Sequence, residues 1–236
     1  ITTYNYENYI KNCLESCLNQ KTSLDYEIIV INDGSTDNTS KILNSYKGIE
    51  RLSLIEIKNS GIEKASNKGF SMAKGKFIVR LDADDLLTTK FLESYSDLIK
   101  NEKYDFLYSD YFVIDADGNI VEEMCLPEFS KKEIFSRGDF LATGTLYRRD
   151  LLDSLGGYEE LIVNSGLENY EYILRLIENG SVGKHLKKKL FKYRRHQKNL
   201  SNLQKDRIIK NGLYLFKRKN YGSFCTNKYH PYGLEI

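Results

Sequence analysis

The sequence lacks long apolar runs and has little cysteine, histidine or proline. No stretch of its 236 residues approaches the roughly 20 apolar residues that a membrane span needs, and no signal-peptide pattern is present. Four cysteines without a C-x-x-C pair and three scattered histidines favour neither a disulfide framework nor a zinc site, so a reducing, cytoplasmic setting fits best. Two prolines and no low-complexity linker indicate one continuous domain. Because Ile1 is not Met and residues 1–3 read as a strand end, we expect the start of the first strand to be missing.

Positive charge is concentrated towards the C-terminus. The whole chain has 35 Lys and Arg against 33 Asp and Glu, yet the segment from Lys184 to Lys219 has 14 basic residues and one acid, Asp206. This asymmetry suggests an anionic partner, either a membrane surface or a lipid-phosphate acceptor, and the alternative is a solvated basic helix face. Nucleic acid is not expected as a partner, because the segment contains no recognised nucleic-acid-binding module and the isoelectric point is only about 8.2.

Apolar strand segments alternate with amphipathic helices in the first hundred residues. Ile10, Cys13, Leu14 and Cys17 recur at helical spacing and predict a helix with both cysteines on its buried face. The full pattern predicts strands over 26–31, 52–57 and 77–81, and helices after Thr36, over 62–73 and from Thr88 to about Asn101. Continuously apolar strands separated by helices favour an α/β fold with a mostly parallel central sheet and helices on both faces.

A different pattern begins after residue 105. Apolar segments over 106–114 and 120–122 flank the turn Asp115–Asn119 and predict a hairpin, so a small antiparallel portion is expected there. The two aspartates of this turn are assigned to turn formation and not to a calcium loop, because the next glutamates come too early for the twelve-residue spacing. Further predictions are a short strand over 145–147 and helices over 168–179 and 201–219.

Two acidic segments directly follow predicted strands: Asn32–Asp37 and Asp82–Asp85. Ligands of open parallel sheets bind beyond the carboxyl ends of the strands, where these segments would lie. For Asp33 or Asp37 alone, turn formation or helix capping is the simpler interpretation. That interpretation is weaker for the second segment, because its three carboxylates repel one another unless a cation or hydrogen-bond donors compensate. A divalent cation, held by one or two carboxylates together with phosphate and water, would stabilise this arrangement.

Taken in order along the chain, these motifs resemble the family 2 glycosyltransferases of GT-A fold. The resemblance rests on the following segments: Thr3–Asn5, Ile31–Asp37, Asn59–Gly61, Asn67–Gly69, Leu81–Asp85, Gly156–Glu160, Glu168–Leu176 and Tyr193–His196. Each motif is weak alone, and their shared order and spacing carry the match. The resemblance implies a Rossmann-like GT-A domain over residues 1–200, followed by a basic helix and tail over 201–236 that packs on the domain or extends from it.

The resemblance implies an inverting sugar transferase that uses a nucleotide diphosphate sugar, most often a UDP-sugar. Its nucleotide-sugar-binding residues would be Thr3, Tyr4, Asn5, Asp33, Asn59, Gly61, Lys64, Asn67, Asp82 and Ala83. In this scheme Asp33 would accept a hydrogen bond from the uracil ring, and Asp82 would face the ribose or a metal-bound water. Asp84 would bind Mn²⁺ or Mg²⁺ at the diphosphate. His196 would complete the metal shell or contact the diphosphate, and a surface position without function is the alternative.

Two positions depart from the family pattern. Where the family usually reads Glu-Asp, with the Asp as catalytic base, this chain has Glu168 and Asn169, and an amide cannot take up a proton at neutral pH. Glu168 is favoured as the base; the alternatives are Glu171, one helical turn later, and little or no transfer activity. At a helix N-terminus, either glutamate would also interact favourably with the helix dipole without a catalytic role. Ser66 replaces an Arg of the family, so Lys64 would supply the positive charge.

These expectations combine into one leading hypothesis. The chain is expected to be a metal-dependent inverting glycosyltransferase of hexosyltransferase type, which moves a sugar to a hydroxyl of a glycan or lipid-linked acceptor in surface polysaccharide synthesis. We expect it in the cytoplasm, with the basic segment holding it at the inner face of the membrane. The alternative is a sugar-nucleotide- or glycan-binding module with weak or no catalysis, and it rests on Asn169.

Overall fold

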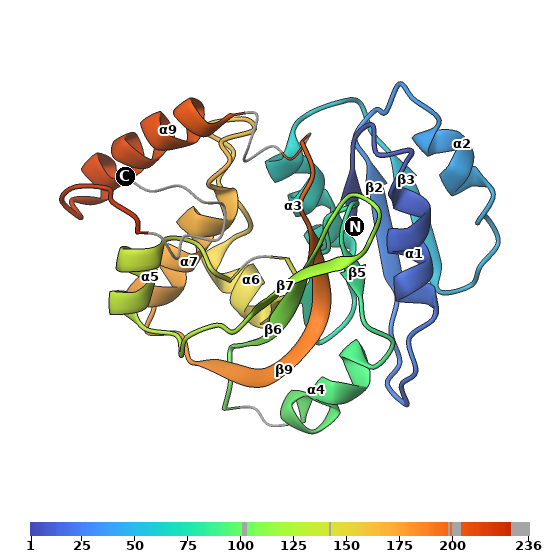
Figure 1. The fold of residues 1–236 in the computed structure, drawn as a ribbon, viewed down its shortest axis with the longest axis horizontal. Coiled ribbons are helices and arrows are strands. Elements are labelled where there is room, and N and C mark those ends of the chain that lie inside the picture. The colour runs from blue at the N-terminus through green and yellow to red at the C-terminus, as the bar shows by residue number, and fades with distance from the viewer. Residues whose placement is uncertain (101–102, 142, 198, 200–203, 228–236) are drawn as a thin grey trace.

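The N-terminal part of the chain forms a parallel sheet with helices between its strands (Figure 1). The structure, a computed structural model, describes residues 1–100, 103–141, 143–197, 199 and 204–227. Its first elements are β1 (Thr2–Thr3), α1 (Ile10–Leu18), β2 (Ile28–Asn32), α2 (Thr39–Asn44), β3 (Leu52–Glu56) and α3 (Ile62–Met72). The central strand β2 pairs in parallel with both neighbours and is apolar over its first four residues, as a strand buried on both faces requires.

Six further strands form a mixed sheet in the described part of the chain, in the order β4-β8-β6-β9-β5 with β7 beside β6. The remaining elements are β4 (Phe77–Val79), β5 (Leu86–Leu87), α4 (Phe91–Ile99), β6 (Phe106–Ile114), β7 (Ile120–Met124), α5 (Lys131–Arg137), β8 (Leu146–Arg148), α6 (Arg149–Leu155), α7 (Glu168–Glu178), β9 (Gly183–Arg194) and α9 (Lys205–Lys219). β6 and β9 pair in parallel, and the other neighbours pair antiparallel. A parallel bridge between Thr2 and Asp82 joins the two sheets, so the acidic segment after β4 lies beside β1.

The elements predicted from the sequence are largely present. Cys13 and Cys17 are buried on α1, the predicted hairpin is formed by β6 and β7, and the helix predicted over 168–179 is α7. The predicted strand over 145–147 is β8, one residue later along the chain. Residue 101 of one predicted helix and residues 201–203 of the last one lie outside the described residues. The α/β fold expected from the sequence is therefore confirmed.

The basic segment Lys184–Lys219 is divided between a strand and a helix. Its first part belongs to β9, in which His185 and Phe191 are buried while Lys187 and Lys188 are exposed. The strand forms because β6 is buried along nearly its whole length, and its backbone groups need a hydrogen-bonded neighbour on each side. The alternative that the basic segment is a solvated helix face is therefore wrong for the part in β9. It applies only to the part in α9.

Helix α9 packs against the hydrophobic cluster that also contains α7. Ile208, Leu215 and Phe216 of α9 are buried in this cluster, and the Phe216 ring stacks on the Tyr170 ring at a centroid distance of 6.1 Å. Figure 1 shows α9 on the side of the molecule away from α1 and α2. Among the described residues, no helix is both long enough and apolar enough to cross a bilayer.

Candidate active site

A cavity of about 910 Å³ lies beyond the carboxyl ends of β1 and β2. Its walls come from the loop after β1, the segments after β2, β3 and β4, the chain before β8, the start of α7 and the end of β9. Asp33 and Asp84 both line it, so the two acidic segments of the sequence share one cavity. The residues proposed from the sequence that line it are Thr3, Tyr4, Asn5, Asp33, Asn59, Asp82, Ala83, Asp84, Glu168, Asn169 and His196.

Asp33 holds the turn that begins α3. Its carboxylate accepts hydrogen bonds from the backbone N–H groups of Ser60 (2.8 Å) and Gly61 (3.0 Å). Gly61 has a φ of +95°, which side-chain-bearing residues rarely adopt, so glycine is favoured at this position. The neighbouring loops are also tied together, because the Asn5 side chain accepts a hydrogen bond from the Thr36 N–H at 2.7 Å. These bonds give the wall around Asp33 a fixed shape.

Two of the three carboxylates in the segment Asp82–Asp85 are neutralised or held by the protein itself. Asp82 forms a two-point ion pair with Arg80, with Nε–Oδ1 and Nη2–Oδ2 distances of 2.8 and 3.1 Å. Arg80 also donates from Nη1 to Glu168 at 3.1 Å, so it links the segment after β4 to the start of α7. Asp85 is fully buried and accepts the backbone N–H of Arg194 at 2.8 Å, which assigns it to the fold.

Asp84 and His196 form the pair of side chains that suits a cation. The imidazole Nε2 lies 2.9 Å from Asp84 Oδ2, and both side chains are only 6–7% exposed. Burial raises the pKa of Asp84, and the hydrogen bond from His196 opposes this rise. Asn199 donates to the same carboxylate oxygen at 3.2 Å, and the Tyr9 ring packs on the imidazole at 4.9 Å.

A divalent cation fits this pair only with further ligands from outside the protein. Carboxylate oxygen and imidazole nitrogen are both common metal ligands, and both side chains line the cavity. Within the described residues, no group of three or more His, Cys, Asp and Glu side chains is placed to hold a metal ion. Asp84 and His196 therefore fit a cation that takes its remaining ligands from a bound diphosphate and water.

Asn169 and Asp139 face each other near the start of α7. The Asn169 Nδ2 atom lies 2.9 and 3.1 Å from the two Asp139 oxygens and 2.7 Å from the Leu141 carbonyl oxygen. Its Oδ1 accepts the Tyr158 hydroxyl at 3.3 Å. Asp139 is 4% exposed and lines the cavity. Burial raises the pKa of Asp139 to about 7, although the hydrogen bond from Asn169 acts in the opposite direction.

Glu168 occupies a different electrostatic environment from Asp139. Burial raises the pKa of Glu168, and the charge of Arg80 opposes this rise. The two side chains form an ion pair at 3.1 Å and are 9% and 12% exposed. Glu168 is thus paired with the positively charged Arg80 guanidinium, whereas the side-chain partner of Asp139 is the neutral Asn169 amide.

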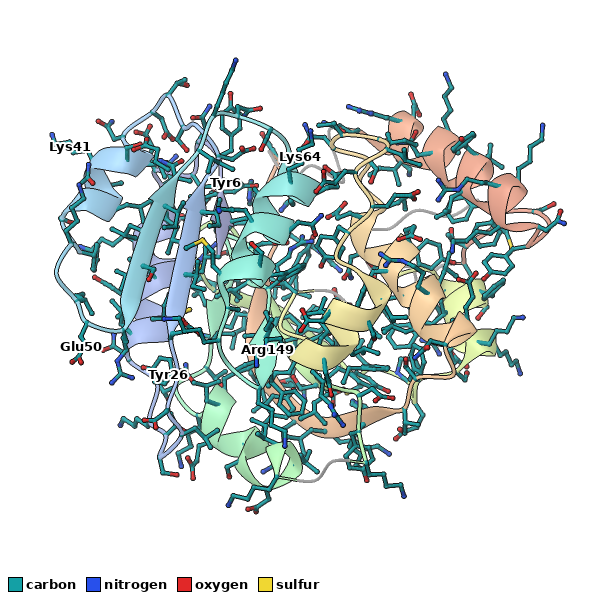
Figure 2. All side chains as sticks on the ribbon, turned by 180° about the vertical axis from the view of Figure 1, so that it is seen from behind. Tyr6, Tyr26, Lys41, Glu50, Lys64 and Arg149 are labelled. Atoms are coloured by element: carbon teal, nitrogen blue, oxygen red, sulfur yellow. The ribbon has the colours of Figure 1, made fainter. Side chains whose placement is uncertain are left out.

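Gly61, Lys64 and Asn67 were proposed for nucleotide-sugar binding and do not line the cavity of the described chain. Gly61 acts through its hydrogen bond to Asp33. The Lys64 side chain lies on the exposed side of the first turn of α3 (Figure 2). Asn67 exchanges hydrogen bonds with the backbone of Tyr158, at 2.8 and 2.7 Å, and so positions the segment that precedes α7.

Glu171 is also outside the cavity, although it is buried. Its carboxylate pairs with Arg175 one turn later at 2.8 Å, and Lys219 of α9 approaches it at 3.4 Å. Glu171 therefore joins α7 to α9 and is not placed to contact a substrate in the cavity.

Several residues that shape the cavity were not proposed from the sequence. They are Tyr9, Arg80, Asp139, Thr143 and Asn199. Arg80 was detectable, because it is a charged residue inside the apolar run over 77–81, and arginine is rarely buried unless it is paired. Asp139 belongs to no pattern that distinguishes it from an ordinary loop aspartate.

The comparisons with known proteins agree on one family. The family model described as "Glycosyl transferase family 2" matches residues 1–156. Chondroitin synthase of Pasteurella multocida (strain Pm70) is 33% identical over 216 residues, which are 89% of this chain but only 22% of that protein. The chain therefore spans less than a quarter of the length of that relative.

Solved structures of the same architecture support the fold. S. aureus TarS 1–349 in complex with UDP-GlcNAc aligns with a TM-score of 0.73 and 22% identity, over 91% of this chain and 63% of that chain. The mannosyltransferase PcManGT from Pyrobaculum calidifontis, in complex with GDP-Man and Mn²⁺, aligns with a TM-score of 0.68 and 16% identity, over 94% of this chain and 63% of that chain.

Proposed function

This chain belongs to glycosyl transferase family 2, and we propose that its cavity transfers a sugar from a nucleotide diphosphate sugar to a hydroxyl of a glycan or lipid-linked acceptor. The proposed donor is a UDP-sugar, the proposed outcome is inversion at the anomeric carbon, and the proposed context is surface polysaccharide synthesis. The proposal rests on one observation: Asp33, the Asp84–His196 pair and the Asp139–Asn169 pair surround a single cavity of about 910 Å³. Small-molecule sites typically measure roughly 300–1,000 Å³, so this cavity can hold a nucleotide sugar.

The donor nucleotide is proposed to bind between the loop after β1 and Asp33. Thr3, Tyr4 and Asn5 line this end of the cavity together with Asn59. Each oxygen of the Asp33 carboxylate already accepts a backbone N–H, and a carboxylate oxygen has a second lone pair that can accept a base N–H. The neighbours of this fold support a nucleotide donor, because TarS is bound to UDP-GlcNAc and PcManGT to GDP-Man.

Metal dependence is proposed from the Asp84–His196 pair. A divalent cation held there would act as a Lewis acid and stabilise the negative charge that develops on the departing diphosphate. The Mn²⁺ in the PcManGT complex supports this assignment. Asp82 is then left to contact the ribose or a water on the cation, while its ion pair with Arg80 fixes its position.

Transfer with inversion requires a carboxylate that takes up the proton of the attacking hydroxyl. Glu168 and Asp139 are carboxylates that line the cavity near the start of α7, and Asn169, which donates to Asp139, cannot serve as a base. A positioned base typically contributes roughly 10²–10⁴-fold to the rate. The same end of the cavity is therefore proposed to bind the acceptor.

The test of this function begins with nucleotide binding. Calorimetric titration of the chain with UDP and with GDP, each with and without MnCl₂, should give Mn²⁺-dependent binding of UDP. Release of UDP from UDP-GlcNAc, UDP-Glc, UDP-Gal and UDP-GlcA is then measured with a panel of oligosaccharide acceptors. If neither nucleotide binds and no sugar nucleotide is consumed, the proposal fails.

A second candidate function is a sugar-nucleotide- or glycan-binding module with weak or no catalysis. Asn169 favours it, because this side chain stands where the family usually has its catalytic carboxylate. The same titrations distinguish the two: tight Mn²⁺-dependent nucleotide binding without turnover for any sugar nucleotide would favour the binding module.

Attachment to an anionic membrane surface is proposed through α9. Lys210 and Lys217 are exposed on this helix beside Leu213 and Tyr214, which are 50% and 55% exposed. Basic and apolar side chains on one exposed helix suit the headgroup region of an anionic bilayer. The lysines of β9 contribute less to this proposal, because Lys189 already pairs with Glu123 at 2.9 Å.

A further inference from the structure

Asn169 is held as a structural hydrogen-bonding group. Its amide nitrogen donates to Asp139 and to the Leu141 carbonyl, and its oxygen accepts the Tyr158 hydroxyl. The side chain is 9% exposed and its polar atoms are occupied by protein partners. It therefore neither accepts a proton nor changes its contacts easily, and catalysis of transfer at this place needs a different group.

Asp139 brings a carboxylate to the same place from another part of the chain. It comes two residues after the end of α5, whereas Asn169 is the second residue of α7, and their side chains meet at 2.9 Å. Both residues line the cavity. Among the described residues, the Asn169 amide and the Leu141 backbone donate to the Asp139 carboxylate. A carboxylate has about four lone-pair sites, so these two donors leave room for a further hydroxyl.

Glu168 is less suited to accept a proton, although it also lines the cavity. Its carboxylate is engaged by the Arg80 guanidinium at 3.1 Å, and this guanidinium also holds Asp82. A cation at hydrogen-bond distance favours the ionised carboxylate and makes it a weaker base. Protonation of Glu168 would also leave buried Arg80 with one charge partner fewer.

We propose that Asp139, and not Glu168, is the general base that removes the proton from the acceptor hydroxyl. This inference rests on the proposed function. The acceptor oxygen forms a bond to the anomeric carbon, and its proton passes to the Asp139 carboxylate. The bond from the anomeric carbon to the diphosphate oxygen breaks, and its electron pair leaves with the nucleoside diphosphate. The proton on Asp139 is later lost to solvent, which restores the carboxylate.

The electrostatic surroundings of Asp139 suit this role. Burial raises its pKa to about 7, close to the value that lets a base be ionised and still take up a proton. The charged groups that face it are Glu168 on α7, which acts to raise this pKa, and Arg80, which acts to lower it. The phenols of Tyr147 on β8 and Tyr170 on α7 are also near, and burial raises the pKa of both above the ordinary range.

The deciding variant is Asp139→Asn. It keeps the size of the side chain and an oxygen that accepts the Asn169 amide hydrogen bond, so a merely structural role would leave kcat close to that of the unaltered chain. Loss of the base should instead lower kcat by roughly 10²–10⁴-fold. Binding of UDP with MnCl₂ should stay unchanged, because Asp139 is assigned to the acceptor. Asp153→Asn on the exposed side of α6 is the matched control.

The pH profile and a double variant complete the test. In the unaltered chain, kcat should rise with pH through about 7, and the residual rate of Asp139→Asn should be flat over that range. Asp139→Asn/Asn169→Asp, which moves the carboxylate across the same hydrogen bond, should recover activity. Unchanged kcat in Asp139→Asn, or a greater loss in Glu168→Gln than in Asp139→Asn, would overturn the inference. If the unaltered chain binds no nucleotide and consumes no donor, the proposed function itself fails.

Discussion

The substitution Asp139→Asn should stabilise the protein relative to the unaltered chain, by an amount that grows as the pH rises. Burial raises the pKa of this carboxyl from 3.8 to about 7 in the folded state. Between these values the folded chain keeps a proton that the unfolded chain has lost, so the free energy of unfolding falls as the pH increases. At about 1.4 kcal/mol per pKa unit, the full loss above pH 7 is about 4 kcal/mol. About 3 kcal/mol of it accumulates between pH 5 and pH 8.

The Asp139→Asn variant has no titrating group at this position, so its free energy of unfolding does not fall for this reason as the pH rises. Its stability relative to the unaltered chain should therefore improve by about 3 kcal/mol between pH 5 and pH 8. For a chain of this length, this equals roughly 6–12 °C in melting temperature. Thermal and urea unfolding, followed by circular dichroism at several pH values, measures the difference directly. A poorly matched amide would lower stability equally at every pH and would not change the slope.

The matched control for this measurement is Asp153→Asn, because Asp153 is exposed. Its stability difference from the unaltered chain should stay constant between pH 5 and pH 8. The reasoning about Asp139 is refuted if the stability difference between Asp139→Asn and the unaltered chain is also constant over this pH range. The Asp139 carboxyl would then have the same pKa in the folded and unfolded chains.

Other perturbations test the remaining assignments. Asp84→Ala should abolish Mn²⁺-stimulated UDP release and leave the fold intact; retained activity with unchanged Mn²⁺ affinity would remove Asp84 from the cation site. Asp33→Ala frees the donors of the turn before α3 and should weaken UDP binding by about tenfold or more, or about 1.4 kcal/mol; equal affinity in calorimetry would contradict that role. Lys210→Glu combined with Lys217→Glu should reduce co-sedimentation with vesicles of anionic phospholipid, and absence of binding by the unaltered chain would end the membrane proposal.

The fold could be predicted where periodicity and turn chemistry agree. The helical spacing of Cys13 and Cys17 and the apolar run in β2 identify their elements without tertiary information. β9 was not predictable in the same way, because the residues Lys187–Lys189 interrupt its apolar pattern. Only the need of β6 for a second neighbour makes that basic segment a strand, and this need is a property of the assembled sheet.

The candidate site could be predicted where its residues follow strands. Asp33 and Asp84 come from two strand ends, and parallel strands bring their carboxyl ends to one edge. Helical spacing did not predict the role of Glu171. It lies one helical turn after Glu168, but its side chain pairs with Arg175 and does not line the cavity. Asp139 could not be predicted, because its meeting with Asn169 depends on how α5 and α7 pack.

The buried acids Glu63 and Asp139 differ in what their ionised carboxylates do for the fold. Glu63 is 1% exposed, and its two oxygens accept the backbone N–H groups of Asn164 and Ser165 at 2.9 and 2.7 Å. A buried carboxylate held by backbone donors stabilises the loop that it binds, so its charge has a structural use. Asp139 is also buried, at 4% exposed, and burial raises its pKa to about 7, so its ionisation opposes folding above about pH 4. An asparagine would make the same contact to Asn169 without that cost. Asp139 differs from buried Asp85, which its hydrogen bond from the Arg194 backbone assigns to the fold, because it lines the cavity beside an amide that cannot act as a base. This position is the one that removal of a proton from the acceptor requires.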